Sequence, residues 1–112
     1  MGGPAGSVIA RSALLVGIVL TTACAQAQDG GALVSRGQAV FRDQGCYGCH
    51  TVGATGTPIA PDLSRIGAKR DQRYLTGWLR DPSRQRPTAH MPRIQLSEPE
   101  VEALAAYLGS LR

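Results

Sequence analysis

The stretch Cys46-Tyr47-Gly48-Cys49-His50 constrains this chain more than any other feature of its sequence. Its two thiols are three positions apart, so one helical turn presents both on the same side. Both can then form thioethers with vinyl groups on one edge of a porphyrin, and the imidazole that follows lies beneath the ring, where it can ligate iron. The C-x-x-C-H spacing therefore predicts one covalently attached c-type haem, bound through Cys46 and Cys49, with His50 as an iron ligand.

Covalent attachment of haem requires that the chain reach a compartment in which the attachment is carried out. Residues 1–27 have the pattern of an export signal, with a basic start at Arg11 and an apolar run over 12–23. That run is short for a membrane span, which usually needs about 20 apolar residues. Small-residue cleavage patterns follow it, at Ala23-Cys24-Ala25 and Ala25-Gln26-Ala27. We expect export to the periplasm and a mature domain over residues 28–112.

Two alternatives for the N-terminus stay open. The apolar run could remain as an uncleaved anchor. Alternatively, Cys24 could become the lipidated first residue of a lipoprotein, although Thr21 stands where such signals usually have leucine. We expect cleavage after Ala25 or Ala27, which would remove Cys24. Association with a membrane is expected only if one of the two alternatives holds.

The mature part is small for a single hydrophobic core, at about 85 residues. The whole chain has one Phe, one Trp and three Tyr, diluted by 14 glycines and seven prolines. A covalent haem would compensate by adding a large apolar plate around which short helices can pack. We therefore predict an all-α fold of three to five short helices around one haem.

The first helix is expected over residues 32–44, after a flexible linker at 29–31. Gly37 in its middle costs about 1 kcal/mol relative to alanine, which predicts the close approach of another helix there. Gly45 ends the helix directly before the haem motif. The apolar face of this helix consists of Leu33, Val34, Gly37, Val40 and Phe41.

Residues 51–61 show no strand alternation and are interpreted as a loop that continues to Gly67. Its Leu63 and Ile66 are candidate haem contacts. A second helix is expected to begin after an Asp71 cap and to end at Asp81-Pro82, since the residue before proline is disfavoured in a helix. Its apolar side carries Tyr74, Leu75, Trp78 and Leu79.

Residues 83–92 are interpreted as a polar loop. The last helix follows a strong start signal, in which Ser97 caps, Glu100 completes a capping box and Pro99 lies in the first turn. We expect this helix to pack across the first, with Tyr107 or Leu104 near Gly37 and Phe41. Its apolar stripe consists of Val101, Leu104, Ala105, Leu108 and Leu111.

The second axial ligand of the iron decides the chemistry of the haem. Met91 is the expected ligand, because it lies in a loop between two helices, is followed by the restraining Pro92, and the motif at Cys46–His50 demands a partner. A thioether is a soft donor that favours reduced iron and would block the site to oxygen and peroxide. The adjacent His90 is an alternative, and an open five-coordinate iron is another.

The formal net charge is +4, almost all of it from arginine. Such a surface suits an acidic protein partner, although the same side chains could simply solvate the surface. No known nucleic-acid motif or aromatic-interleaved basic stretch is present, so no nucleic-acid partner is expected. The basic residues concentrate between the loop and the methionine: Arg65, Lys69, Arg70, Arg73, Arg80, Arg84, Arg86 and Arg93.

Taken in order, these motifs resemble class I cytochromes c, which are small electron carriers. The resemblance covers nearly all of the mature part. It rests on Gly37 and Phe41, Cys46-x-x-Cys49-His50, Pro61-Asp62-Leu63, Tyr74-Leu75-x-x-Trp78-Leu79-x-Asp81-Pro82, Met91-Pro92 and Leu104-Ala105-Ala106-Tyr107-Leu108.

The resemblance implies roles for individual residues. His50 would be the proximal and Met91 the distal ligand, and the Pro61 carbonyl would accept the other ring N–H of His50. Trp78 would lie near the methionine side of the haem, and Arg70 is a candidate partner of a haem propionate.

The function expected from these observations is one-electron transfer between redox partners, without enzymatic activity. An alternative is an electron-transfer subunit of a larger redox complex. Another is a haem-based ligand sensor or enzyme with an open distal site. Structural zinc held by Cys46, Cys49, His50 and His90 is disfavoured, because adjacent Cys49 and His50 fit one tetrahedral site poorly. A thioredoxin-like dithiol is disfavoured because no βαβ pattern surrounds the cysteines.

Overall fold

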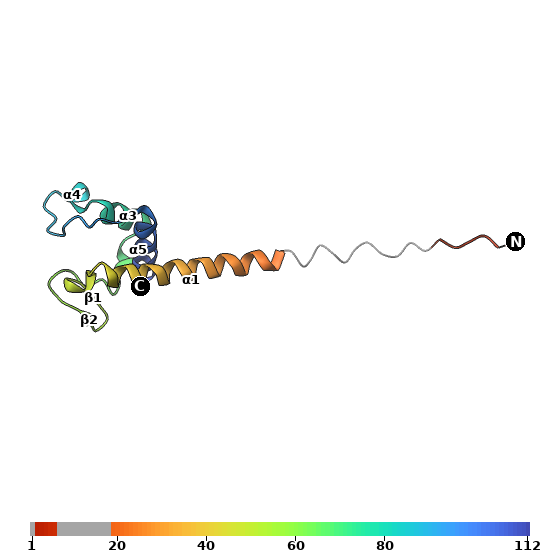
Figure 1. Cartoon of the computed structure of the whole chain (residues 1–112), viewed down its shortest axis with the longest axis horizontal. Helices are drawn as coiled ribbons and strands as arrows, with labels where there is room; N and C mark the ends of the chain where they lie inside the picture. Colours follow the sequence, from red (N-terminus) through yellow and green to blue (C-terminus); the bar gives the residue numbers. More distant parts are fainter. Residues whose placement is uncertain (1, 7–18) are drawn as a thin grey trace.

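Five α-helices, one 3-10 turn and a two-stranded hairpin make up the computed structural model, which describes residues 2–6 and 19–112 (Figure 1). The predicted all-α class is confirmed. The elements are α1 (Val19–Asp43), η1 (Cys46–Gly48), β1 (Thr51–Val52), β2 (Thr55–Gly56), α2 (Ile66–Lys69), α3 (Gln72–Arg80), α4 (Pro82–Gln85) and α5 (Glu98–Ser110).

The first helix is longer than expected. It was predicted over residues 32–44 after a flexible linker, whereas α1 spans 25 residues and continues through Gly30 and Gly31. The prediction of a linker at 29–31 was wrong because helix propagation adds one hydrogen bond for each residue fixed, which offsets the cost of two exposed glycines. The start of α1 extends away from the packed part of the molecule (Figure 1).

The first part of the predicted apolar run, residues 12–18, lies outside the described residues, which omit positions 1 and 7–18. Cleavage and lipidation of Cys24 therefore stay predictions. Within the described part of the chain, no helix combines the length and the apolar character that a membrane crossing requires.

The crossing of α1 and α5 forms the centre of the fold, as predicted. Gly37 lies against the backbone carbonyl of Ala103, and a β-carbon at position 37 would come within 2.7 Å of Tyr107 Cβ. Phe41, 2% exposed, packs edge-on against Tyr107 with ring centroids 5.6 Å apart. The absence of a side chain at Gly37 therefore lets the two helices approach closely.

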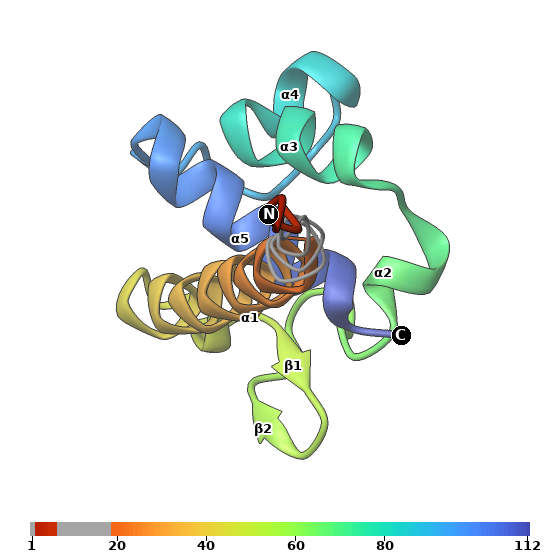
Figure 2. The same ribbon diagram turned by 90° about the vertical axis from the view of Figure 1, so that its right-hand side faces the viewer.

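Helix α5 is buried on more than one face, because it contacts α1, α2 and α3 (Figure 2). This explains why Ala103 and Tyr107 are buried in addition to most of the predicted stripe. The core cluster contains Phe41, Leu75, Leu79, Val101, Leu104, Ala105, Tyr107 and Leu108.

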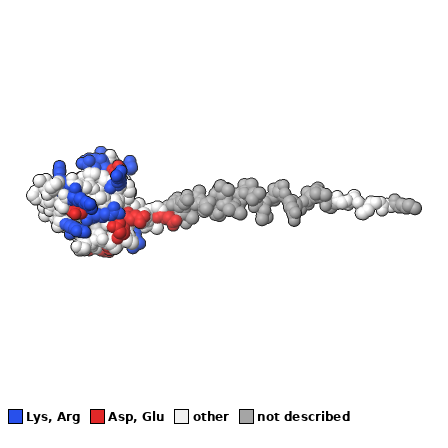
Figure 3. All heavy atoms as spheres, turned by 90° about the horizontal axis from the view of Figure 1, so that it is seen from above, with Lys and Arg blue, Asp and Glu red and all other residues white. Residues whose placement is uncertain are grey.

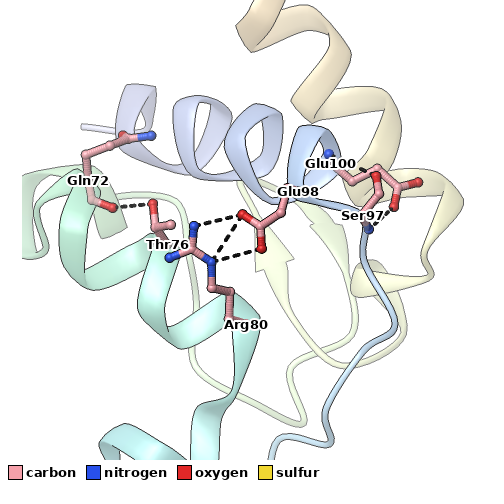
Figure 4. A network of polar contacts seen from close by, with 6 residues as sticks. All are labelled: Gln72, Thr76, Arg80, Ser97, Glu98 and Glu100. Carbon is pink, nitrogen blue, oxygen red and sulfur yellow. Dashed lines mark hydrogen bonds and ion pairs between the residues drawn. The ribbon is translucent and has the colours of Figure 1, made fainter.

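Both predicted helix caps are present. The Asp71 carboxylate accepts the Tyr74 backbone N–H at 2.8 Å at the start of α3. At the start of α5, Ser97 and Glu100 form the reciprocal capping box, with the Ser97 N–H donating to the Glu100 carboxylate at 2.8 Å. Arg80 at the end of α3 pairs with Glu98 at 2.8 Å and so links the two helices (Figure 4).

Three segments predicted to be loops contain short regular elements. β1 and β2 form an antiparallel hairpin in which Gly53 has a φ of 59° at the first turn position, a conformation that glycine allows. Helix α2 is a single turn within the stretch predicted to continue the loop to Gly67. Helix α4 begins at Pro82, because proline that ends one helix also suits the first position of the next.

Candidate haem site

The haem motif lies on a tight turn directly after α1. Gly45 has a φ of 76°, which ends the helix and reverses the chain. The backbone N–H groups of Cys49 and His50 then both donate to the Cys46 carbonyl, at 3.2 and 3.0 Å. This turn brings both cysteines and the imidazole together, as the spacing predicted.

Both thiols of this turn are free. Cys46 is half-buried and packs against the core, and this burial raises the pKa of its thiol. Cys49 is exposed. The turn therefore presents one sulfur beside the core and one near the surface, both available for thioether formation.

The His50 ring is fixed by the loop that returns from the hairpin. Its Nδ1 lies 2.7 Å from the carbonyl oxygen of Pro61, the contact that the resemblance implied. With Nδ1–H donating to that carbonyl, the lone pair of Nε2 is left for a metal. The imidazole is thus oriented by backbone geometry.

The returning loop is tied to the haem motif by backbone hydrogen bonds. The Thr57 N–H donates to the Tyr47 carbonyl at 3.0 Å, and the Ala60 N–H donates to the Cys49 carbonyl at 2.8 Å. Gly56 has a φ of 110° and lies against the His50 carbonyl. A β-carbon at position 56 would collide with that carbonyl. These contacts fix the path from the hairpin to Pro61.

Asp62 holds the same loop from its other side. Its carboxylate accepts the Ser64 hydroxyl at 2.6 Å and the Thr51 hydroxyl at 3.1 Å. The hydrogen bonds from Ser64, followed by that from Thr51, lower the pKa of Asp62. The Ser64 hydroxyl in turn accepts the Gly53 N–H at 2.7 Å, so the network joins the hairpin turn to the residue after Pro61.

On the methionine side, Trp78 contacts the sulfur of Met91 directly. The indole N–H donates to Met91 Sδ at 3.1 Å. The Trp78 ring is stacked on Tyr74, with centroids 6.1 Å apart and planes 15° apart. The Arg70 guanidinium lies 4.4 Å from the centre of the Tyr74 ring. Four side chains thus form a row that ends at the sulfur.

The remaining predicted site residues lie as follows. Leu63 and Ile66 are half-buried and pack against the core cluster. Arg70 is exposed and lies over the Tyr74 ring. His90, the residue before Met91 in the chain, is also exposed. Because Cys46, Leu63 and Tyr74 all pack on one core cluster, the motif side and the methionine side of the site share a core.

This donor set fits a covalent haem. Two free thiols, an imidazole with its Nε2 available and a thioether sulfur are the groups that c-type haem uses. Among the side chains that the structure describes, those of residues 2–6 and 29–112, no group of three or more His, Cys, Asp or Glu gathers where it could hold a metal ion.

Sequence reasoning did not identify two features of the site. The Asp62 network was missed, although an Asp two residues before Ser64 is a turn signal that could have indicated it. Tyr74 was assigned only to an apolar helix side. Its spacing of four residues from Trp78 places both rings on one face of α3 and could have indicated their stack.

Comparison with known proteins agrees with this geometry. Residues 34–112 match the family model for cytochrome c. The chain is 36% identical over 89 residues to cytochrome c oxidase subunit 2 of Alkalihalophilus pseudofirmus, covering 71% of this chain and 26% of that protein. It is 30% identical over 81 residues to a subunit of the nitric oxide reductase of Stutzerimonas stutzeri, covering 67% of this chain and 56% of that protein.

The chain spans about a quarter and just over half of these two relatives, so the similarity covers only part of each. A family match that contains the C-x-x-C-H turn implies a covalently bound haem c with its iron. By its family match, its helical fold and its haem-attachment turn, this chain is a member of the cytochrome c family, whose domains transfer electrons through haem.

Proposed function

We propose that this chain is an exported one-electron carrier of the periplasm, with haem bound through Cys46 and Cys49 and with His50 and Met91 as axial ligands. The observation that carries the proposal is that each axial ligand already has a partner of its own. The imidazole is held by the Pro61 carbonyl, and the thioether is held by the Trp78 indole. Both donors are thereby oriented by the protein.

The protein residues supply orientation and electronic tuning. The Pro61 carbonyl fixes the His50 ring and makes Nε2 a better donor to a metal, because it accepts a hydrogen bond from Nδ1–H. The Met91 thioether is a soft donor that would favour reduced iron and would take the position that oxygen or peroxide needs. When bound, the haem supplies an iron that changes its charge by one electron. A site closed in this way would support electron transfer without enzymatic activity.

A second candidate function is an electron-transfer subunit or domain of a larger redox complex. It is favoured by the relatives, which by name are subunits of cytochrome c oxidase and nitric oxide reductase. Either function needs redox partner proteins. On the face seen in Figure 3, Lys and Arg side chains form several clusters on the folded part, which suits partners with acidic docking surfaces.

The test uses protein expressed with haem-attachment machinery. The wild type should gain the mass of one haem, resist extraction of the haem and show the weak long-wavelength absorption band of methionine-ligated oxidised iron. Met91→Ala should keep the haem, lose that band, lower the midpoint potential and let carbon monoxide bind the reduced form. An unchanged potential in Met91→Ala would overturn the ligand assignment. Ready binding of carbon monoxide by the wild type would favour a sensor or an enzyme.

Export is tested separately, by the mass of the mature protein from its native host. Cleavage after Ala25 or Ala27 predicts a chain that begins near residue 26 or 28 and carries one haem. A lipid on Cys24 or a retained N-terminus would show that the protein is tethered to a membrane. Recovery of a haem-free chain from the cytoplasm would contradict the proposal.

A further inference from the structure

We propose that a pocket between the end of α3, α4 and the segment that leads into α5 binds an extended acidic segment of a partner protein. The inference rests on the proposed function only in taking that partner to be a redox protein. The pocket has a volume of about 320 Å³, and no residue of the haem-attachment turn lines it. In two views, α3 and α4 lie on the opposite side of α1 and α5 from the hairpin that follows this turn (Figures 1 and 2).

The bottom of the pocket is apolar. Leu79 of α3 and Val101 of α5 line it, and they are 7% and 2% exposed. Ile94 and Leu96 line it from the segment between Met91 and α5, and both are half-buried. Because transfer of apolar surface out of water is favourable, such a pocket suits one aliphatic side chain of a ligand.

Both acidic residues of the pocket already have partners within the protein. The Glu98 carboxylate pairs with Arg80 at 2.8 Å (Figure 4), and the Asp81 carboxylate accepts the Ser83 hydroxyl at 2.7 Å. The hydrogen bond from Ser83, followed by the charge of Arg93, lowers the pKa of Asp81. The formal net charge of the residues that line the pocket is +1, so an anionic ligand is favoured over a cationic one.

Two arginines at the rim are available to such a ligand. Arg84 on α4 and Arg93 are both exposed. Within the described residues, neither forms an ion pair with a carboxylate. A guanidinium group can bind a carboxylate through two parallel hydrogen bonds. An aspartate or glutamate side chain therefore fits the rim, next to the aliphatic side chain that fills the bottom.

Residues 93–96 also offer backbone groups to a ligand. Among the described residues, no backbone–backbone hydrogen bond includes an N–H or C=O group of this segment. Arg93 and Gln95 are exposed, whereas Ile94 and Leu96 are half-buried, which is the two-residue period of an extended strand. A segment of this kind can pair with a strand of another chain, as the edge of a sheet does.

These features together favour a protein segment over other anions. In a strand added beside residues 93–96, one apolar side chain can enter the pocket while acidic side chains before and after it reach the two arginines. A membrane surface would use the arginines but neither the pocket nor the unpaired backbone groups. Because Arg93 follows Met91 by two residues, the segment would hold its protein on the methionine side of the proposed haem site.

The probe is a short capped peptide in which leucine and aspartate alternate, titrated into the reduced holoprotein. Calorimetry gives its affinity, and nuclear magnetic resonance gives its position. The amide signals of residues 93–96 should shift, and those of the haem-attachment turn should not. A peptide with asparagine in place of aspartate should bind about tenfold more weakly, since it lacks the charge.

Two methylated peptides test the pairing of the backbones. Only alternate N–H groups of an added strand face the chain beside it. Methylation of one alternating set of backbone nitrogens should therefore abolish binding, and methylation of the other set should leave it nearly unchanged. Equal binding of both methylated peptides would overturn the strand arrangement.

The two rim arginines are tested by substitution. Arg84→Gln and Arg93→Gln should each weaken binding of the aspartate peptide about twofold to fivefold. Arg36→Gln is the matched control, because Arg36 is an exposed arginine of α1 that does not line the pocket. It should keep the affinity of the wild type. Equal weakening by all three substitutions would show that only the overall charge attracts the peptide, and the inference would fail.

Two further measurements separate the alternatives. Binding to phosphatidylglycerol vesicles that the rim substitutions abolish, without any binding of the peptide, would assign the arginines to a lipid surface and overturn the inference. Met91→Ala separates the pocket from the proposed function. If the peptide does not bind the wild type while Met91→Ala lowers the midpoint potential, only the role of the pocket is lost. If Met91→Ala keeps the wild-type potential, the ligand assignment fails whatever the peptide does.

Discussion

Gly37 of α1 lies directly against the backbone carbonyl of Ala103 in α5, and a β-carbon there would also come within 2.7 Å of Tyr107 Cβ. A backbone carbonyl cannot rotate away as a side chain can. The crossing of the two longest helices therefore depends on the missing side chain at this one position.

Replacement of Gly37 by alanine should destabilise the holoprotein by about 1–3 kcal/mol, because the helices must separate or bend to admit the methyl group. The free energy of unfolding is measured by guanidinium denaturation followed by circular dichroism. Gly31→Ala is the matched control: it lies in the same helix with no atom within 4 Å of the added carbon. It should leave stability unchanged or raise it by up to about 1 kcal/mol. Equal effects of the two substitutions would contradict the role of the helix crossing.

The helix crossing was predictable because it depends on residue types and on the helical spacing of apolar residues, both of which can be read from the sequence. A glycine in an apolar stripe and a matching stripe near Tyr107 are both visible in the sequence, and so are the Asp71 and Ser97 caps. The hairpin at Gly53 was not predicted, since two-residue strands are too short to show alternation. The resemblance placed Trp78 on the methionine side, but the hydrogen bond from Trp78 to Met91 was not predicted, because it joins residues 13 positions apart through tertiary packing.

A second glycine is expected to matter for the haem site itself. Gly56 has a φ of 110° and lies against the His50 carbonyl, whereas Gly53 has a φ of 59° and no atom within 4 Å of an added β-carbon. Gly56→Ala should cost about 1–3 kcal/mol through backbone strain and should also displace His50. The yield of stable holoprotein and its haem spectrum are the measurements.

Gly53→Ala is the control for this prediction, since it carries the strain of a positive φ without the contact to His50. It should lower stability and leave the haem spectrum unchanged. A normal spectrum and yield for Gly56→Ala would mean that the approach of this residue to His50 does not position the ligand.

Tyr107 should make stability depend on pH in alkaline solution. It is 5% exposed, and burial together with a hydrogen bond with Tyr47 raises its pKa to about 12, from the usual value of about 10. Between these values the unfolded chain loses the phenol proton while the folded chain retains it. The contribution of Tyr107 is therefore fully present below pH 10 and is lost as the pH rises towards 12.

The measurement is the free energy of unfolding of the wild type and of Tyr107→Phe at several pH values from about 8 to about 11.5. The difference between the two should stay constant up to about pH 10 and then shrink. Tyr74→Phe, which removes a phenol outside the buried core cluster, should leave the wild-type pH profile unchanged. A difference that stays constant throughout the range would show that Tyr107 ionises equally in both states.

The arginine-rich surface should govern reactions with charged redox partners. Arg84, Arg86 and Arg93 are exposed, and Arg80 is paired with Glu98. Ferricyanide is a multiply charged anion and serves as a probe for acidic partners. Its rate of oxidation of the reduced protein should fall steeply with added salt, because the screening length shortens to about 10 Å at 0.1 M.

Two variants and a second oxidant show whether these arginines cause the salt dependence. An Arg84→Gln, Arg86→Gln double variant should react more slowly with ferricyanide at low salt and show a shallower dependence. Asp43→Asn, which removes an exposed acidic group at the end of α1, should slightly steepen it. A cationic cobalt(III) phenanthroline complex should show the opposite dependence with the wild type, since like charges repel less when they are screened. A ferricyanide rate that stays flat from low to high ionic strength would show that these arginines serve the solubility of the surface and do not attract acidic partners.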